Sequence, residues 1–398
     1  MGERSRVATQ PAAAPYQYIT RMNALAIYDK LTAGRSRFIR IDRLCEQAGD
    51  AFPGLLPSRG ELQVEGRLAQ RDKKGLEKAQ GLFLSQVLAD PACGAHLCHA
   101  MLLPREESLS RLPDYENTGK ADFVGAQLRR EGKASVLTMR NPRFLNAEDE
   151  STLDGMEIAV DLALLDAKTE VCVLRGGPVE HPKYAGRRLF GAGINLTHLY
   201  QGKIRFLWYL IRDLGFVNKI YRGLAAPDCS PEEKTLEKLW IAAVEGFAIG
   251  GHCQVLLTMD YILAAQDAYL TLPARKEGII PGAANLRLPR FVGDRIARQA
   301  VMAERRIDCA SPEGRLICDE IVPAEDMDAA LARTVEKLTG SGVVSAAGNR
   351  RAFRVAEEPL ELFRRYMAVY AREQASCHFS PALIANLERN WDAASRRG

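Results

Sequence analysis

The chain has 398 residues, of which 47% are apolar and 26% charged, and its formal net charge is +4. This is the composition of an ordinary folded protein, and the length predicts a core domain with one or two smaller units. The small net charge argues against a nucleic-acid-binding protein, because such proteins concentrate Lys and Arg in patches that neutralise phosphates. Nine cysteines without zinc-finger spacing, no apolar secretion segment and no membrane-spanning apolar run predict a soluble cytoplasmic protein without a membrane partner.

The N-terminal part predicts a separate helical domain over residues 1–120. Residues 1–17 are rich in Ala, Pro, Gln and Arg and are expected to be disordered. Residues 22–101 carry apolar side chains at spacings of three and four, which is the period of a helix with one buried face. Residues 104–120 are polar and are interpreted as a linker to the next domain.

Four potential metal ligands crowd together in this helical part: Cys93, His96, Cys98 and His99. Cys93, His96 and His99 recur at a spacing of three, so one helix face could present them to zinc. No second cluster supplies the remaining ligand, and we therefore predict packed helix residues and no metal.

After residue 120 the pattern alternates between strands and helices. Residues 123–129 and 134–139 predict a hairpin, and residues 146–150 begin a helix with an acidic first turn. A buried strand is expected at 171–177, followed by a loop at 178–186.

The segment 203–222 predicts one helix with an apolar stripe for the core. Its opposite face carries the following side chains: Arg205, Trp208, Tyr209, Arg212 and Lys219. That face could be solvated or form an interface. Further along, we expect a strand at 261–265, a helix at 294–303 and C-terminal helices over 326–398.

A glycine-rich turn in the middle of the chain is the main chemical signal. The apolar run 239–244 predicts a buried strand, and the turn 245–254, which contains Gly250 and Gly251, leads directly into a helix. Glycines allow a tight bend and close approach of a ligand, and the first helical amides remain unpaired. The turn therefore predicts an anion or oxyanion site, although it is neither a Walker A motif nor a dinucleotide fingerprint.

Three further motifs make this signal more specific, at residues 140–147, 188–196 and 272–290. In this order and together with the glycine turn, they resemble the enoyl-CoA hydratase/isomerase (crotonase) superfamily over residues 121–325. The resemblance implies an α/β fold with a crotonase-like ββα spiral core. It also implies that C-terminal helices, here residues 326–398, cover a neighbouring active site and help to build a homotrimer or homohexamer.

The same resemblance implies acyl-CoA chemistry. Crotonase-fold proteins stabilise the enolate of an acyl-CoA thioester with two backbone amides, which here would belong to Ile194 and Gly251. Hydratases carry catalytic glutamates at positions that Gln254 and Ala274 occupy in this chain. Because neither residue exchanges a proton at neutral pH, addition of water to a double bond loses both carboxyl groups, and a hydratase is not expected.

The helical N-terminal extension and residues 146–149, 181–188 and 250–254 resemble the cofactor-free dioxygenases of this superfamily, which act on an arylacetyl-CoA in antibiotic biosynthesis. On this basis Glu148 is expected to contact ring hydroxyls, while Arg212 and Gln254 line the reaction site. The other expected substrate contacts are His181, Lys183, Tyr184, Ala192, Gly193, Asn195, Leu196 and Gly250.

The implied reaction needs O2 as co-substrate and no metal or flavin, and CoA enters as part of the substrate. The carbon between aryl ring and thioester loses a proton, and the carbanion passes an electron to O2. A peroxide forms at that carbon, attacks the thioester carbonyl and expels CoA, which leaves an arylglyoxylate. The residues do not assign the general base.

Simpler interpretations stay open at this point. Glu148 could be only a first-turn acid, Arg212 a salt-bridge partner and Gln254 a remnant. The protein could also be a crotonase-fold thioesterase, decarboxylase or isomerase, or a silent acyl-CoA-binding scaffold.

Overall fold

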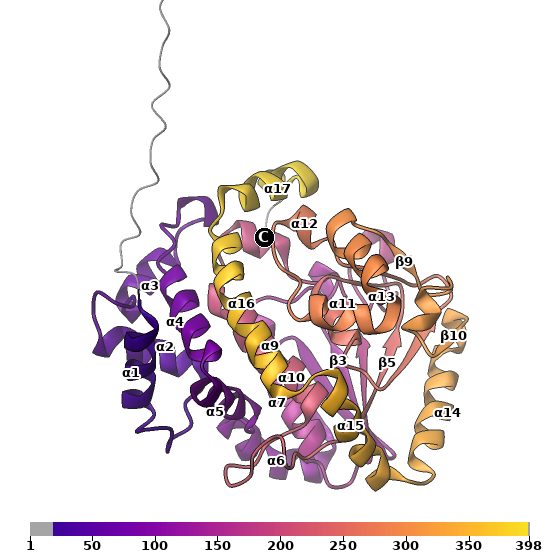
Figure 1. Cartoon of the computed structure of the whole chain (residues 1–398). Helices are drawn as coiled ribbons and strands as arrows, with labels where there is room; N and C mark the ends of the chain where they lie inside the picture. The colour runs from indigo at the N-terminus through magenta and orange to yellow at the C-terminus, as the bar shows by residue number, and fades with distance from the viewer. Residues whose placement is uncertain (1–18, 397–398) are drawn as a thin grey trace, which may run out of the picture.

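The computed structural model describes residues 19–396 and contains a seven-stranded sheet and a three-stranded sheet among many helices (Figure 1). The segment 1–17, for which disorder was predicted, lies outside the described residues. The large sheet has the order β1-β2-β3-β4-β5-β7-β10. Its strands are β1 (Lys120–Phe123), β2 (Ala126–Glu131), β3 (Ala134–Met139), β4 (Val171–Gly176), β5 (Leu239–Val244), β7 (Tyr261–Ala265) and β10 (Glu320–Val322).

The predicted hairpin is confirmed, since β2 and β3 pair antiparallel, and β1 adds a third strand to it. From β3 to β10 the neighbouring strands run parallel. Every residue of β4 is buried, and β5 is buried from Trp240 onward. Such strands need apolar side chains on both faces, which explains why continuous apolar runs predicted them.

The small sheet has the order β6-β8-β9 and consists of β6 (Phe247–Ile249), β8 (Tyr269–Thr271) and β9 (Ile307–Asp308). The predicted direct passage from strand to helix is therefore wrong, because β6 lies between β5 and α11 (Gly251–Leu256). Ala248 of β6 also bridges to Gly191. The small sheet thus brings the two glycine-rich segments side by side.

The N-terminal helices pack against two later helices of the chain, α9 (Phe206–Leu214) and α16 (Leu360–His378). Figure 1 shows α16 running alongside α4 and α5. The helical prediction for residues 22–101 is confirmed by α1 (Arg21–Leu31), α2 (Ile41–Ala51), α3 (Arg59–Glu65), α4 (Lys78–Ala89) and α5 (Pro91–Leu102).

The linker prediction for residues 104–120 is wrong, because most of this segment forms α6 (Glu106–Thr118). Its first turn carries Glu106 and Glu107, which suits the positive end of the helix, and Gly119 ends it in the left-handed conformation. Pro113 inside the helix leaves the Leu109 carbonyl without its usual donor. Leu109 is exposed, so water can replace that donor.

The predicted single helix 203–222 consists of two helices, α9 and α10 (Phe216–Arg222), separated by Gly215. A Cβ at Gly215 would collide with the Ile211 carbonyl and lie 3.1 Å from Glu157 Oε2. Helices from both ends of the chain surround α9, so neither of its faces is solvated. Arg212 and Lys219, expected on a second face, are only 2% and 0% exposed.

The remaining helices agree with the predicted helical segments. The helix predicted at 294–303 is the second half of α13 (Ala284–Ala303), which bends at Gly293. The described part of 326–398 is helical as expected. The others are α7 (Glu150–Leu165), α8 (Leu196–Tyr200), α12 (Ala274–Glu277), α14 (Met327–Thr339), α15 (Val343–Glu357) and α17 (Pro381–Trp391).

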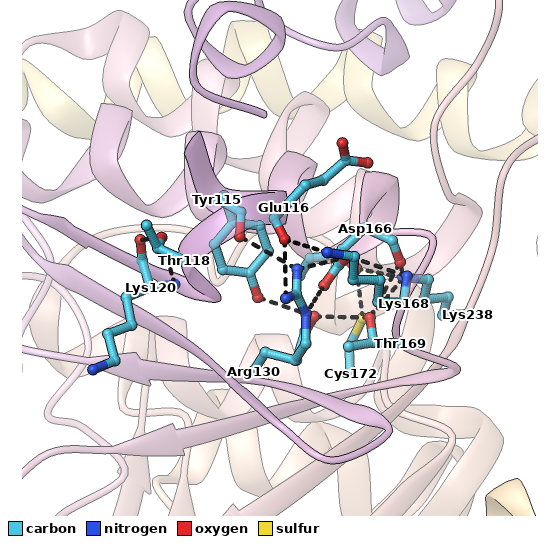
Figure 2. Close-up of polar contacts among 12 residues, drawn as sticks. Tyr115, Glu116, Thr118, Lys120, Arg130, Asp166, Lys168, Thr169, Cys172 and Lys238 are labelled. Atoms are coloured by element: carbon cyan, nitrogen blue, oxygen red, sulfur yellow. Dashed lines mark hydrogen bonds and ion pairs between the residues drawn. The ribbon is translucent and has the colours of Figure 1, made fainter. Parts of the chain in front are cut away.

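A partly buried polar network joins the ends of α6 and α7 to the large sheet (Figure 2). Arg130 of β2 binds the Asp166 carboxylate with Nε–Oδ2 and Nη2–Oδ1 distances of 2.8 and 3.0 Å, and its Nη1 donates to the Glu116 carbonyl. Lys168 Nζ donates to the same carbonyl, and Lys238 Nζ donates to the carbonyls of Ala163 and Asp166. These cations satisfy carbonyls that helix ends leave unpaired.

Within residues 19–396 we find no helix of the length and apolarity that a bilayer crossing requires.

Candidate active site

Two backbone turns, at Gly193-Ile194 and at Gly250-Gly251, lie against each other. Gly193 has a φ of +78°, which favours glycine, and a Cβ placed on it would lie 3.2 Å from the Gly251 nitrogen. Backbone hydrogen bonds of 2.7 Å join the Glu148 amide to the Gly193 carbonyl and the Asn195 amide to the Glu148 carbonyl. The first turn is thereby fixed to the segment that precedes α7.

A buried histidine holds the two turns together. The Gly193 amide donates a hydrogen bond of 2.9 Å to Nδ1 of His252, which belongs to α11. Burial lowers the pKa of His252 to about 4, so the imidazole is neutral at pH 7 and Nδ1 is free to accept this bond. A Cβ on Gly191 would collide with the same imidazole, so glycine is needed for this close packing.

The amide groups of Ile194 and Gly251 donate no hydrogen bond to any residue between 19 and 396. Ile194 follows the glycine turn, and Gly251 is the first residue of α11, where helix geometry leaves amides unpaired. Both residues line one cavity. Two free amides beside one cavity can stabilise negative charge on a ligand oxygen.

The cavity is narrow, with about 20 Å³ of solvent-accessible volume, which is room for about one water molecule. Its walls come from the two glycine turns, α9, α11, α12, α16, the residue after β8 and the loop after α12. The lining residues are Ile194, Trp208, Tyr209, Arg212, Asp213, Gly250, Gly251, Gln254, Leu272, Ala274, Glu277, Ile279, Ile280, Pro281 and Tyr370.

Arg212 is the centre of a saturated hydrogen-bond network at this cavity. Its Nε and Nη2 donate to Glu148 at 2.8 and 3.3 Å, and Nη2 also donates to the Gly251 carbonyl at 2.7 Å. Its Nη1 donates to Asp213 Oδ1 at 2.9 Å and to Gln254 Oε1 at 3.1 Å. A guanidinium has five N–H donors, and the protein uses all of them.

These hydrogen bonds show where three predicted residues lie relative to the cavity: Arg212, Gln254 and Glu148. The salt-bridge interpretation of Arg212 is confirmed, and the same side chain lines the cavity together with Gln254. Glu148 is buried beside Arg212 and is absent from the cavity wall. The structure therefore assigns Glu148 and Arg212 a common task, which is to hold the start of α11 and Gln254 in place.

The other predicted contacts lie outside the cavity wall, except Gly250. Asn195 caps α8 and donates from Nδ2 to Asp149 at 3.0 Å, so its side chain is used within the protein. His181 and Lys183 are exposed on the loop after β4, and the ring of Tyr184 packs edge-on against Phe247. Three predicted residues lie in or next to the first glycine turn without lining the cavity: Ala192, Gly193 and Leu196.

Five polar or aromatic residues of the cavity wall were not predicted as site residues, namely Trp208, Tyr209, Asp213, Glu277 and Tyr370. Trp208 Nε1 and the Tyr209 hydroxyl are buried and have no hydrogen-bond partner among the described residues. Tyr370 comes from α16, so this helix covers the cavity of its own chain, whereas the resemblance had implied cover from a neighbouring subunit. The one available signal for Glu277 was its position three residues after Ala274, on the same helical side.

The alternative zinc interpretation is not supported. Nδ1 of His96 lies 2.7 Å from the Tyr28 hydroxyl, and Nε2 of His99 lies 2.8 Å from the Ala226 carbonyl. In the part of the chain that the structure describes, no three His, Cys, Asp or Glu side chains are grouped so as to hold a metal ion.

Comparison with known proteins identifies relatives over most of the chain. The family model described as enoyl-CoA hydratase/isomerase matches residues 129–368. The chain is 47% identical over 364 residues to a (3,5-dihydroxyphenyl)acetyl-CoA 1,2-dioxygenase of Amycolatopsis orientalis, covering 91% of this chain and 83% of the relative. It is 31% identical over 182 residues to a short-chain-enoyl-CoA hydratase of Clostridium acetobutylicum, covering 45% of this chain and 62% of that protein.

Solved structures confirm the predicted fold. An enoyl-CoA hydratase/isomerase from Xanthobacter autotrophicus Py2 superposes with a TM-score of 0.56 at 19% identity, covering 69% of this chain and 96% of that one. An enoyl-CoA hydratase from Mycobacterium avium subsp. paratuberculosis gives a TM-score of 0.55 at 20% identity, covering 67% and 98%. The matched residues, the identities and this fold show that the chain belongs to the enoyl-CoA hydratase/isomerase family.

Proposed function

We propose that this protein is a cofactor-independent dioxygenase that converts (3,5-dihydroxyphenyl)acetyl-CoA and O2 to (3,5-dihydroxyphenyl)glyoxylate and free CoA. The observation that carries this proposal is the 47% identity over 91% of the chain to a dioxygenase of that name. The match extends well beyond residues 129–368, which the general family model covers. A reaction of this kind belongs to the biosynthesis of dihydroxyphenylglycine for glycopeptide antibiotics.

The two unpaired amides have a clear task in this reaction. When the carbon between ring and thioester loses a proton, negative charge develops on the thioester oxygen. Fixed donors from Ile194 and Gly251 would stabilise that oxygen, and loss of one such donor typically costs about 3 to 4 kcal/mol. The buried Arg212 network keeps Gly251 in position, since it binds the carbonyl of the same residue.

The remaining steps belong to the substrate and O2. The enolate transfers one electron to O2, and the two radicals combine to form a peroxide at the α-carbon. The terminal peroxide oxygen attacks the thioester carbonyl carbon, the carbon–sulfur bond breaks, and CoA leaves as its thiol after protonation. The remaining α-hydrogen then leaves as a proton, and the electrons of its C–H bond form the ketone while the O–O bond breaks. One O2-derived oxygen is then on the ketone and the other on the carboxylate.

The apolar part of the cavity wall suits such intermediates. Leu272, Ile279, Trp208 and Tyr370 surround the space beside the free amides. A dry pocket strengthens hydrogen bonds to the enolate and keeps water from competing with O2. In this proposal the electron-rich ring replaces a metal or flavin.

We also propose where the rest of the ligand and further subunits bind. His181, Lys183 and Tyr184 lie outside the cavity and are candidates for contacts to CoA. Residues 326–398 would join subunits into a homotrimer or homohexamer while α16 closes the cavity. Residues 1–120 would act as a helical domain beside the catalytic core 121–325, and the protein would work in the cytoplasm.

The proposal is tested with purified, metal-stripped protein and dihydroxyphenylacetyl-CoA in an oxygen electrode. We expect O2 consumption equal to CoA release, and two labelled oxygen atoms in the glyoxylate when 18O2 is supplied. Release of CoA in anaerobic buffer would instead indicate a thioesterase. Tight binding of CoA thioesters without turnover would indicate a scaffold, and a strict need for added iron would exclude the cofactor-free mechanism.

A further inference from the structure

We propose that the Glu277 carboxylate is the general base that removes the α-proton of the arylacetyl-CoA. This inference rests on the proposed function and assigns a step for which sequence analysis found no residue. It is carried by the position of Glu277 in the cavity wall, its lack of a protein partner and its closeness to both glycine turns.

Glu277 replaces a carboxyl group that the chain lacks at a neighbouring position. Ala274 stands where hydratases carry a catalytic glutamate, and Glu277 is three residues later in α12. Residues three apart in a helix lie on the same side, and both side chains line the cavity. The longer Glu277 side chain can therefore reach the space that Ala274 leaves open.

The carboxylate lies close to the proposed oxyanion site. Glu277 Oε2 is 4.0 Å from the position of a Cβ built on Gly250, and that position is 3.8 Å from the Cα of Gly193. A thioester whose oxygen binds Ile194 and Gly251 would thus hold its α-carbon near the Glu277 carboxylate. This is the neighbourhood in which a base must lie to accept the α-proton.

No charged group forms an ion pair with the Glu277 carboxylate among the described residues. The side chain is 4% exposed, and within residues 19–396 no donor or cation binds its oxygens. The adjacent Lys276 points instead to Glu304, at 3.9 Å, and to the ring of Trp391. Asp213, the second carboxylate in the cavity wall, is already bound by Arg212.

The surroundings also bring the pKa of Glu277 close to neutral pH. Burial raises the pKa of Glu277 to about 7, and Lys276 opposes this only in part. The other titratable or charged side chains that line the cavity are Tyr209, Arg212 and Asp213 of α9 and Tyr370 of α16. A base with a pKa near the working pH combines a useful ionised fraction with sufficient basicity.

In the proposed step the α-carbon–hydrogen bond breaks and the proton moves to a Glu277 oxygen. The bonding electrons form the enolate, whose oxygen accepts from the Ile194 and Gly251 amides. When O2 is absent, the reaction stops here, and Glu277 returns a proton to the same carbon. In D2O this reversal replaces the α-hydrogens by deuterium.

The experiment follows this exchange by NMR, with (3,5-dihydroxyphenyl)acetyl-CoA under argon in D2O, and follows O2 uptake in air. We expect Glu277→Gln to lower both rates by at least about 100-fold, the usual contribution of a general base. Glu277→Asp should keep part of both rates, because it retains a carboxylate at a greater distance. Glu304→Gln is the matched control, since it removes a carboxylate beside Lys276 that does not line the cavity.

The pH profile distinguishes a base from a structural residue. The rate of the unaltered protein should fall below about pH 7, and the residual rate of Glu277→Gln should lose this dependence. Exchange and O2 uptake within fivefold of the unaltered protein would overturn the assignment of Glu277. If the unaltered protein itself neither exchanges the α-hydrogens nor consumes O2, the proposed function fails first.

Discussion

Two buried glutamates, Glu277 in the cavity wall and Glu358 between α15 and α16, face opposite surroundings. Glu358 is 0% exposed and forms ion pairs with Arg222, Arg287 and Arg290 at 3.2, 2.9 and 2.7 Å. Burial opposes its ionisation, but the three guanidiniums outweigh that effect and lower the pKa of Glu358 to about 2. Glu277 is buried almost as deeply without a partner, and its pKa rises to about 7.

A glutamate side chain thus has a structural role at position 358, whereas we propose a chemical role for it at position 277. Glu358 joins α10 and α13 to the start of α16, and a permanently charged, fully bonded carboxylate suits that task. Arg212 is saturated in the same way. At the cavity, several groups have no hydrogen-bond partner among the described residues: the Ile194 and Gly251 amides, Trp208 Nε1, the Tyr209 hydroxyl and the Glu277 carboxylate. Groups of this kind that line a cavity are available to a bound ligand.

The largest expected effect comes from breaking the Glu358 cluster. Glu358→Ala would leave buried guanidiniums unpaired, which typically costs about 3 to 5 kcal/mol. Urea unfolding at pH 7 measures this loss. Glu357→Ala is the control, because the Glu357 side chain is 44% exposed and its ion pair with Arg290 is longer, at 3.7 Å. It should cost at most about 1 kcal/mol, and equal losses for both variants would mean that the ion pairs of Glu358 do not stabilise the fold.

Gly251→Ala should act on turnover. A Cβ there would lie 2.6 Å from Glu148 Oε2 and 3.1 Å from Arg212 Nη2, so the start of α11 must shift and its amide with it. We expect kcat to fall about 100- to 1,000-fold, as for loss of one oxyanion donor. Steady-state O2 uptake measures it. Gly348→Ala in α15, where a Cβ meets no atom within 4 Å, should leave kcat unchanged.

Glu277→Gln should stabilise the protein while it removes activity. A folded-state pKa of about 7, above the ordinary 4.5, means that the favourable contribution of Glu277 is present below pH 4.5 and is lost as pH rises through 7. Glutamine has no such loss. The variant should gain about 2 to 3 kcal/mol over the unaltered protein between pH 5 and pH 8. Urea unfolding at both pH values measures the gain, and a pH-independent difference would speak against a buried, ionising Glu277.

The smallest effect is expected from Lys276→Ala. Lys276 lowers the pKa of Glu277 by its positive charge. Solvent screens this effect, because the Lys276 side chain is 38% exposed. Removing it should move the acid limb of the pH–rate profile upward by less than about one unit. An unchanged acid limb would mean that another group controls the profile.

Arg212→Ala should lower stability as well as turnover. Removing a fully bonded, buried guanidinium leaves the Glu148 and Asp213 carboxylates without their partner. Such a change typically costs about 3 to 5 kcal/mol of stability, so loss of folding would accompany loss of activity.

The sequence by itself determined the hairpin, the strands near 171–177, 239–244 and 261–265, and the two glycine turns, whereas the amides of Ile194 and Gly251 were inferred from the family resemblance. These features depend on local rules, namely apolar runs that fill both faces of a strand and glycines that permit a tight turn. Chain order of four such motifs was enough to identify the family.

Tertiary structure alone decided which polar groups have partners. Nothing near Arg212 in the sequence shows that Glu148 and Gln254 saturate it, and nothing near Glu277 shows that its carboxylate stays unbonded in a cavity closed by α16. The prediction of a core face and a second, opposite face for residues 203–222 was wrong for the same reason, because helices from both ends of the chain bury both faces. Burial and pairing depend on residues far away in the sequence, and they set the pKa values and free donors on which the chemistry depends.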